Sequence, residues 1–185
     1  MIAFVLMLSC ILPYPISHNQ NVKDAIIELL DNSKDLQPIG KIKDILIREG
    51  IYDKLPLSPP LKGKLRVNSY YGYRIHPLSG DKKFHSGVDL AVELATPVYS
   101  AGAGTVIFAG RKGGYGRCVI IKHIFGFTSI YAHLSAYYTT KGEEVRQGQA
   151  IGFVGSTGKS TGNHLHFEIR KNNRAINPIY NEHER

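Results

Sequence analysis

Histidine and aspartate residues recur at short spacings in the second half of the chain. His85 and Asp89 stand four residues apart, which returns both side chains to one side of the backbone whether the segment is extended or helical. His164 and His166 flank a leucine in an apolar run, so β-strand alternation places both imidazoles on one face. His133 ends another apolar run. Zinc prefers such ligands, and a catalytic site uses three of them and leaves a fourth position for a nucleophilic water. One aspartate and two of these histidines would suffice.

Four further residues near these positions have both functional and structural interpretations. Tyr131 shares the strand face of His133, so it either lines a substrate groove or packs on the sheet. Glu168 shares the face of the two histidines that precede it, and an exposed glutamate is favoured over a contact with a metal ligand. His76 precedes a proline in a predicted turn and is interpreted as structural. His123 is expected to be exposed at the edge of a loop.

The segment beyond residue 65 consists of short β-branched and aromatic runs separated by glycine-rich turns. The clearest runs are 97–100, 105–109, 118–123, 127–132, 150–154 and 164–170. The connections between them are too short for crossover helices. The sequence therefore predicts a mainly β fold, an antiparallel β-sandwich or open barrel, preceded by a short α-helical segment.

The first 60 residues have a different pattern. Residues 1–13 are apolar over the length of a secretory signal rather than of a membrane span. Residues 21–50 predict two short amphipathic helices with a break at Pro38-Ile39-Gly40, and the proline-rich residues 55–64 predict an extended linker. We therefore divide the chain into a candidate signal or anchor segment (1–20), a helical segment with its linker (21–60) and a catalytic domain (61–182).

Charge and cysteine content exclude several functional classes. The 185 residues include 23 Lys+Arg and 15 Asp+Glu, a net charge of +8 that favours an acidic partner such as nucleic acid, anionic lipid or an anionic cell-wall polymer. No nucleic acid is expected, because no basic run or nucleic-acid-binding motif is present. No apolar stretch is long enough for a multi-pass membrane protein. Cys10 and Cys118 are too few for a disulfide framework, and Cys118 is predicted to be a buried thiol.

Residues 67–170 resemble the lysostaphin-like, LytM-type zinc metalloendopeptidases of the M23 class, which hydrolyse peptidoglycan. The resemblance covers more than half of the chain and keeps the order of the family's motifs. The matching motifs are YGYRIHP at 71–77, HSGVDLA at 85–91, TPV at 96–98, GGYG at 113–116, YAHLS at 131–135, GSTG at 155–158 and HLHFE at 164–168.

This resemblance implies a role for each residue of the candidate site. His85, Asp89 and His166 are expected to hold one Zn²⁺ per chain, while His133 and His164 are expected to be catalytic without binding the metal. The implied substrates are the peptide stems of peptidoglycan, cleaved at cross-links or bridges. The implied location is the cell envelope, either secreted or attached peripherally to the membrane or to lipid through the N-terminus.

Two functions of other classes compete with this one. A non-catalytic LytM-type regulator of a cell-wall amidase would be favoured if a ligand were missing, but all five residues are present. A biotinyl or lipoyl carrier domain requires a lysine in a specific hairpin context, which Lys112 and Lys141 lack. The sequence leaves open whether the cleaved bond is a D-Ala–diamino acid cross-link or a glycine bridge, and whether residues 21–60 inhibit the site or recruit a partner.

Overall fold

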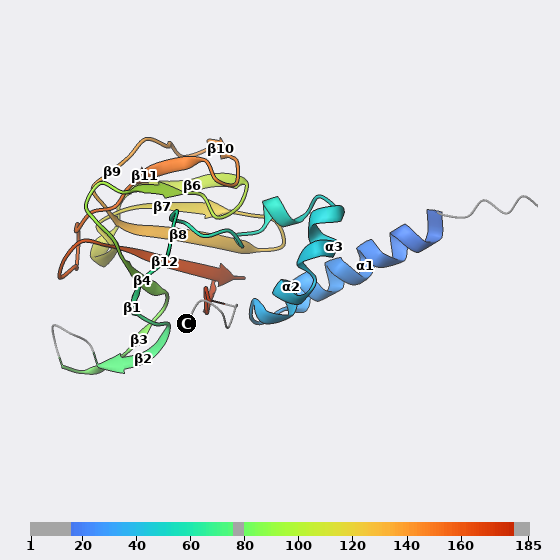
Figure 1. Ribbon diagram of the computed structural model, residues 1–185, viewed down its shortest axis with the longest axis horizontal. Helices are drawn as coiled ribbons and strands as arrows, with labels where there is room; N and C mark the ends of the chain where they lie inside the picture. Colours follow the sequence, from blue (N-terminus) through green and yellow to red (C-terminus); the bar gives the residue numbers. More distant parts are fainter. Residues whose placement is uncertain (1–15, 76–79, 180–185) are drawn as a thin grey trace, which may run out of the picture.

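The computed structural model describes residues 16–75 and 80–179, and it has a helical part followed by a larger β part (Figure 1). The helices are α1 (Ile16–Asn32), α2 (Gln37–Lys41) and α3 (Lys43–Arg48), with short 3₁₀ helices η1 (Tyr52–Lys54) and η2 (Gly113–Tyr115). The strands are β1 (Val67–Ser69), β2 (Gly72–Ile75), β3 (Lys82–His85), β4 (Val88–Ala91), β5 (Pro97–Tyr99), β6 (Gly104–Arg111), β7 (Arg117–Lys122), β8 (Phe127–Leu134), β9 (Ala136–Tyr137), β10 (Glu144–Val145), β11 (Ala150–Phe153), β12 (His164–Lys171) and β13 (Arg174–Ile176).

Antiparallel pairing organises these strands into three sheets. The eight-stranded sheet has the order β1-β4-β12-β8-β7-β6-β10, with β13 paired to β12 outside this path. A three-stranded sheet has the order β5-β11-β9, and β2 pairs with β3 in a two-stranded sheet. Strands adjacent in sequence are often adjacent in space, as β6, β7 and β8 are, because their connections are short. The predicted mainly β, antiparallel fold is confirmed.

The hydrophobic core lies between the large sheet and the three-stranded sheet. Val119, Ile121 and Tyr131 of the large sheet belong to the same buried cluster as Val98 and Ile151 of the smaller one. Val119 and Ile121 are two residues apart on β7, so their side chains share one face of the strand. The arrangement fixes β8 and β12 at the centre of a packed sheet, which is where three of the candidate histidines are located.

The opposite face of the large sheet is also partly covered. Cys118, Ile120, Ile130 and Ala132 form a second buried cluster, against which Phe108 and Tyr115 pack. Cys118 is a free, buried thiol, as the sequence predicted, and burial raises its pKa to about 11. The thiol is therefore protonated at neutral pH and takes no part in metal binding or disulfide chemistry in the described part of the chain.

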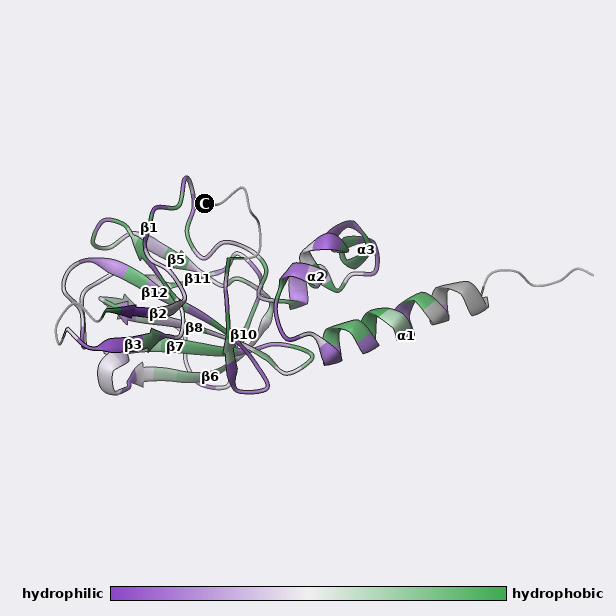
Figure 2. Ribbon diagram, turned by 90° about the horizontal axis from the view of Figure 1, so that it is seen from below, coloured by the Kyte–Doolittle hydropathy of each residue, from purple (hydrophilic) through white to green (hydrophobic). Residues whose placement is uncertain are grey.

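The helical part differs in detail from the expected pair of helices. Pro38-Ile39-Gly40 does not break the helical region, because these residues form α2 themselves, with the proline in its first turn. Both views place the helices together at one end of the molecule, and Figure 2 shows alternating hydrophobic and hydrophilic stretches along α1. Ile26, Leu30 and Leu46 are buried in the same cluster as the β core. None of the helices in the two described ranges combines the length and apolar character needed to cross a bilayer.

Residues 55–61 form neither helix nor strand and bend repeatedly, and they pack closely on the β part instead of acting as an extended spacer. Leu55 and Leu57 are buried in the main core. The Ser58 amide donates to the carbonyl oxygen of Ala101 at 3.0 Å, and the Tyr99 amide donates to the carbonyl oxygen of residue 60 at 2.9 Å. The buried side chains of Leu55 and Leu57 explain the difference. Their burial stabilises the packed conformation, whereas a linker of polar residues alone would stay flexible.

Candidate metal centre

Strand pairing brings together residues that are far apart in sequence. His85 is the last residue of β3, and Asp89 lies in β4. β4 pairs antiparallel with β12, where Asp89 stands directly opposite His166. Gly87 makes this approach possible, because a Cβ atom at its position would lie 2.3 Å from the carbonyl oxygen of Phe167. The His-x-Gly-x-Asp spacing therefore serves close packing of β4 on β12 as well as ligand placement.

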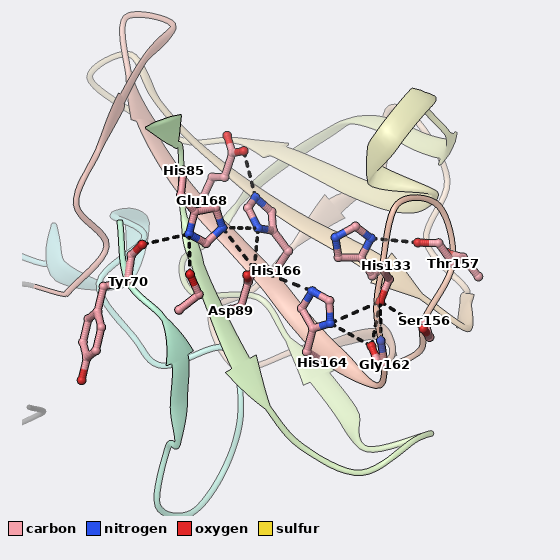
Figure 3. A network of polar contacts seen from close by, with 12 residues as sticks. Tyr70, His85, Asp89, His133, Ser156, Thr157, Gly162, His164, His166 and Glu168 are labelled. Atoms are coloured by element: carbon pink, nitrogen blue, oxygen red, sulfur yellow. Dashed lines mark hydrogen bonds and ion pairs between the residues drawn. The ribbon is translucent and has the colours of Figure 1, made fainter. Parts of the chain in front are cut away.

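Three potential ligand atoms converge on one point (Figure 3). His85 Nε2 lies 3.1 Å from His166 Nδ1 and 3.1 Å from Asp89 Oδ1, and His166 Nδ1 lies 2.8 Å from the same oxygen. Zinc bonds of about 2.0–2.2 Å in a tetrahedral site separate their ligand atoms by roughly 3.3 Å. The observed triangle is close to this size, and its donor set of two imidazoles and one carboxylate suits zinc, so the residues fit the metal.

The atoms of these residues that point away from the triangle are also held. His85 Nδ1 lies 2.9 Å from the carbonyl oxygen of Tyr70, which can only accept, so Nδ1 carries the hydrogen and Nε2 offers its lone pair. Arg74 Nη2 donates to Asp89 Oδ2 at 3.3 Å. Burial raises the pKa of Asp89, but donation from the imidazoles of His166 and His85, in their protonated forms before a metal ion binds, outweighs this effect and holds the pKa well below its usual range.

Glu168 is not the surface residue that the sequence favoured, because it is fully buried. Its Oε1 lies 3.0 Å from His166 Nε2, 2.5 Å from Ser86 Oγ and 2.7 Å from Tyr115 Oη, and its Oε2 accepts from Arg170 Nε at 2.8 Å. Burial raises its pKa, but the hydrogen bonds from His166, Ser86 and Tyr115 prevail and lower the pKa to about 2. Glu168 is therefore an ionised acceptor, which leaves the hydrogen of His166 on Nε2 and the lone pair on Nδ1.

His133 and His164 lie beside the triangle, with ring centroids 4.7 Å apart. Each is held through Nδ1, which lies 2.8 Å from the carbonyl oxygen of Thr157 for His133 and 2.9 Å from that of Gly162 for His164. Their Nε2 atoms consequently remain available, and His164 Nε2 is 3.7 Å from Asp89 Oδ1. His133 also has φ +61°, a left-handed conformation that costs energy in a residue other than glycine.

Burial lowers the pKa of the His133 imidazole. The pKa falls to about 4, with a further contribution from the neighbouring histidines at 164 and 166. His133 is therefore neutral at pH 7, with its hydrogen on Nδ1 and a lone pair on Nε2. Such a group can accept a proton from a molecule placed beside it.

A cleft of about 740 Å³ connects these side chains with solvent. All five candidate residues line it, and the hairpin of β2 and β3 forms one wall while residues 159–161 form part of another. Tyr115 and Arg74 also line the cleft. The sequence motifs at 71–77 and 113–116 contain these two residues, but no role follows from the motifs without the contacts described above.

The structure corrects two other expectations. Tyr131 does not line the cleft: it is fully buried, and its hydroxyl accepts from the Ala101 amide at 2.7 Å and lies 3.0 Å from Ser129 Oγ. Of the two interpretations, packing on the sheet is the correct one. His123 is buried rather than exposed, with Nδ1 2.8 Å from the carbonyl oxygen of Ala103 and Nε2 2.8 Å from Ser129 Oγ. The expectation for His76 lies outside the described residues.

The chain is similar to known proteins in both sequence and structure. DD-carboxypeptidase/endopeptidase Mpg of Neisseria meningitidis serogroup B is 49% identical over 114 residues, which cover 62% of this chain and 26% of that protein. Peptidoglycan DD-endopeptidase ShyA of Vibrio cholerae is 37% identical over 121 residues, covering 65% of this chain and 28% of that protein. The crystal structure of a zinc-containing peptidase from Vibrio cholerae matches with a TM-score of 0.61 at 32% identity, covering 71% of this chain and 40% of that one.

The family match includes all of the motifs identified in the sequence except the first, at 71–77. This chain spans about a quarter of the length of the two curated relatives, 26% and 28%. The family model of peptidase family M23 matches residues 83–178, a range that contains the three residues of the triangle and both neighbouring histidines. The match covers more than half of the chain, and the protein belongs to peptidase family M23.

Proposed function

We propose that the protein is a zinc-dependent endopeptidase that hydrolyses peptide cross-links or bridges of bacterial peptidoglycan. The observation that carries the proposal is the triangle of His85 Nε2, Asp89 Oδ1 and His166 Nδ1, with two further imidazoles turned toward it by their Nδ1 hydrogen bonds. The M23 match supports a peptidase, and the name of the relative ShyA supports peptidoglycan as the substrate. Residues 61–182 would form the catalytic domain, within which the family match lies.

In this proposal His85, Asp89 and His166 hold one Zn²⁺ per chain. When bound, zinc lowers the pKa of water toward neutrality and polarises a peptide carbonyl. The protein's contribution is to keep the three ligand atoms unprotonated and in place. Hydrogen bonds to Tyr70 and Glu168 fix the imidazole tautomers, and a hydrogen bond from Arg74 holds the carboxylate of Asp89.

Proton transfer is assigned to His133 and His164. Because Nδ1 of each ring donates to a backbone carbonyl, the Nε2 lone pair is the only acceptor that each neutral ring offers to the cleft. One of these atoms takes the proton of the attacking water as the new C–O bond forms, and the resulting imidazolium gives this proton to the leaving amine nitrogen when the C–N bond breaks. The other histidine of this pair, when it is protonated at Nε2, donates a hydrogen bond to the carbonyl oxygen as negative charge develops there.

The complete ligand set distinguishes this function from that of a non-catalytic regulator of a cell-wall amidase. A regulator would need the cleft only as a binding surface, and nothing would then maintain three convergent ligand atoms in defined tautomers. A peptidoglycan substrate also supports a location in the cell envelope. We propose export, with peripheral attachment through the N-terminal residues as one form of it.

Digestion of purified sacculi tests the proposal. The zinc-loaded protein should release fragments whose new amino and carboxyl termini, identified by mass spectrometry, lie at a peptide bond of a cross-link or bridge. The variant His164→Ala, which keeps all three proposed ligands, is the matched control and should bind zinc but release far less product. A zinc-loaded wild-type protein that leaves sacculi unchanged would contradict the proposed activity.

A further inference from the structure

Basic side chains flank the candidate metal centre on both sides. Arg74 and Lys83 line the cleft from the β2–β3 hairpin, and Lys159 lines it from the loop between β11 and β12. Among the described residues that line the cleft, Asp89 is the only one with a carboxylate. Its Oδ1 is occupied within the triangle, and its Oδ2 accepts from Arg74. The cleft therefore has an excess of positive charge even before a metal ion is added.

The β2–β3 hairpin holds its two cations in different ways. Arg74 is about two-thirds buried, with 29% of its side chain exposed, and is oriented by Asp89. Lys83 is its direct neighbour across the hairpin and forms an exposed ion pair with Asp81 at 3.7 Å. An exposed pair of this length is weak, so Asp81 does little to prevent the ammonium group from attracting a ligand carboxylate.

Lys159 is held on the other side of the histidines. Its backbone amide donates to the carbonyl oxygen of Gly114 at 2.8 Å, and its aliphatic stem packs along the same glycine. Figure 3 shows the loop that carries Thr157 and Gly162 on the side of the site opposite His85 and Tyr70. Lys159 belongs to this loop, so a peptide that crosses the metal centre runs from the Arg74 and Lys83 side toward Lys159.

We propose that Arg74, Lys83 and Lys159 recognise free carboxylates of the substrate on both sides of the scissile bond. This inference rests on the proposed function and makes it more specific. The preferred substrate is a cross-linked stem peptide whose acidic residues and C-terminus are unamidated, and an uncharged glycine bridge is a poor substrate. Fixed cations in a cleft attract and orient such groups, and an arginine fork matches the geometry of a carboxylate.

Paired substrates and paired variants provide the test. The zinc-loaded protein is given a synthetic cross-linked stem-peptide dimer with free carboxylates, the same dimer with these groups amidated, and an oligoglycine peptide with both termini capped so that it is uncharged. The variants are Lys83→Gln, Lys159→Gln and the double variant, since neither lysine contacts a proposed ligand. Lys141→Gln, which removes one exposed positive charge outside the cleft, is the matched control. Zinc content and thermal melting are measured for every variant.

Each single cleft variant should lower kcat/KM for the free-acid dimer by about two- to fivefold, and the double variant should lower it by about tenfold. Cleavage of the amidated dimer should be slower in the wild type and should change less than twofold in the variants. Raising the salt concentration should slow only the free-acid reaction. The control should match the wild type, and zinc content should stay constant throughout.

The outcomes separate the inference from the proposed function. If the wild type cleaves the free-acid, amidated and oligoglycine substrates equally well, or if Lys141→Gln loses as much activity as the cleft variants, carboxylate recognition by the cleft is wrong while the peptidase function stands. If the zinc-loaded protein cleaves none of the three peptides, the proposed function fails and the inference fails with it.

Discussion

His166 Nε2 lies 3.0 Å from Oε1 of Glu168, two residues further along β12 and fully buried behind the metal-binding triangle. The carboxylate also accepts from Ser86, Tyr115 and Arg170. Four donors around one buried carboxylate leave it little freedom to move, so the imidazole that donates to it is fixed as well. Glu168 thereby determines which nitrogen of His166 faces the triangle.

Replacing Glu168 by Gln should weaken zinc binding. The amide removes the negative charge and turns one acceptor into a donor that faces other donors, so His166 loses part of its orientation. Such partners of metal ligands typically contribute 10- to 100-fold to metal affinity. Competition with a chromophoric chelator measures the dissociation constant. Glu144→Gln, at an exposed glutamate that accepts from Thr105, is the control and should bind zinc like the wild type. An unchanged zinc affinity in Glu168→Gln would show that the contact has no influence on the metal.

Two histidines on one strand provide a direct comparison of metal binding and catalysis. His166→Ala removes a proposed ligand, so zinc should fall below one equivalent per chain and activity should fall with it. His164→Ala and His133→Ala leave the three ligands intact, so zinc should remain near one equivalent while kcat falls by about 10²- to 10⁴-fold. Elemental analysis of each purified variant measures the zinc. The assignment of β12 is reversed if His164→Ala loses zinc and His166→Ala keeps it.

Gly87 couples the stability of the fold to the metal site. A Cβ atom there would lie 2.3 Å from the Phe167 carbonyl oxygen and 2.8 Å from Glu168 Cγ, so β4 and β12 would have to move apart. Gly87→Ala should therefore cost about 1–3 kcal/mol of unfolding free energy and lower the melting temperature by roughly 3–10 °C. Gly162→Ala is the control, because a Cβ atom at Gly162 would meet nothing within 4 Å. Equal melting temperatures for the two variants would contradict the packing argument.

The strands that the sequence predicts best are those buried on at least one face along their length. β7 contains the continuous apolar run 118–121, β8 contains the apolar run 130–132, and β12 alternates polar and apolar residues; the boundaries of all three agree with the expected ranges within a few residues. The β2–β3 hairpin has no such signal, because Tyr73, Ile75 and Phe84 are largely exposed and charged residues lie between them. The motif at 71–77 marks this segment as similar to the family, but the pairing of β2 with β3 is visible only in the structure.

The errors at Glu168 and His123 have one physical cause. Alternation along a strand assigns a side chain to a face, but it carries no information about what covers that face. Glu168 lies on the site-facing side of β12, where Tyr115 and Ser86 contact it from other segments. His123 follows β7 directly and is enclosed by Ala103 and Ser129. Polar residues of this kind are buried by tertiary partners that local sequence patterns do not identify.

His123 makes the folded state sensitive to acid. Burial lowers the pKa of this imidazole from 6.5 to about 4 in the folded protein, although a backbone hydrogen bond to Ala103 opposes the shift. The unfolded chain keeps the ordinary value, so between about pH 6.5 and pH 4 the unfolded state binds a proton that the folded state does not. The neutral imidazole's contribution is fully present above pH 6.5 and is lost as the pH falls toward 4. The difference corresponds to an order of 3 kcal/mol.

Replacing His123 by Gln should reduce this acid dependence. Glutamine does not titrate, so the free energy of unfolding should fall less between pH 7 and pH 4.5 in His123→Gln than in the wild type, although the variant should be less stable at pH 7 because the hydrogen bond to Ala103 is lost. Urea unfolding in the presence of EDTA at several pH values measures the slope without the effect of zinc release. Ser129→Ala is the control, since it removes the partner of Nε2 but keeps the imidazole, and it should retain the wild-type slope. Parallel pH dependences for wild type and His123→Gln would mean that this buried imidazole does not govern acid stability.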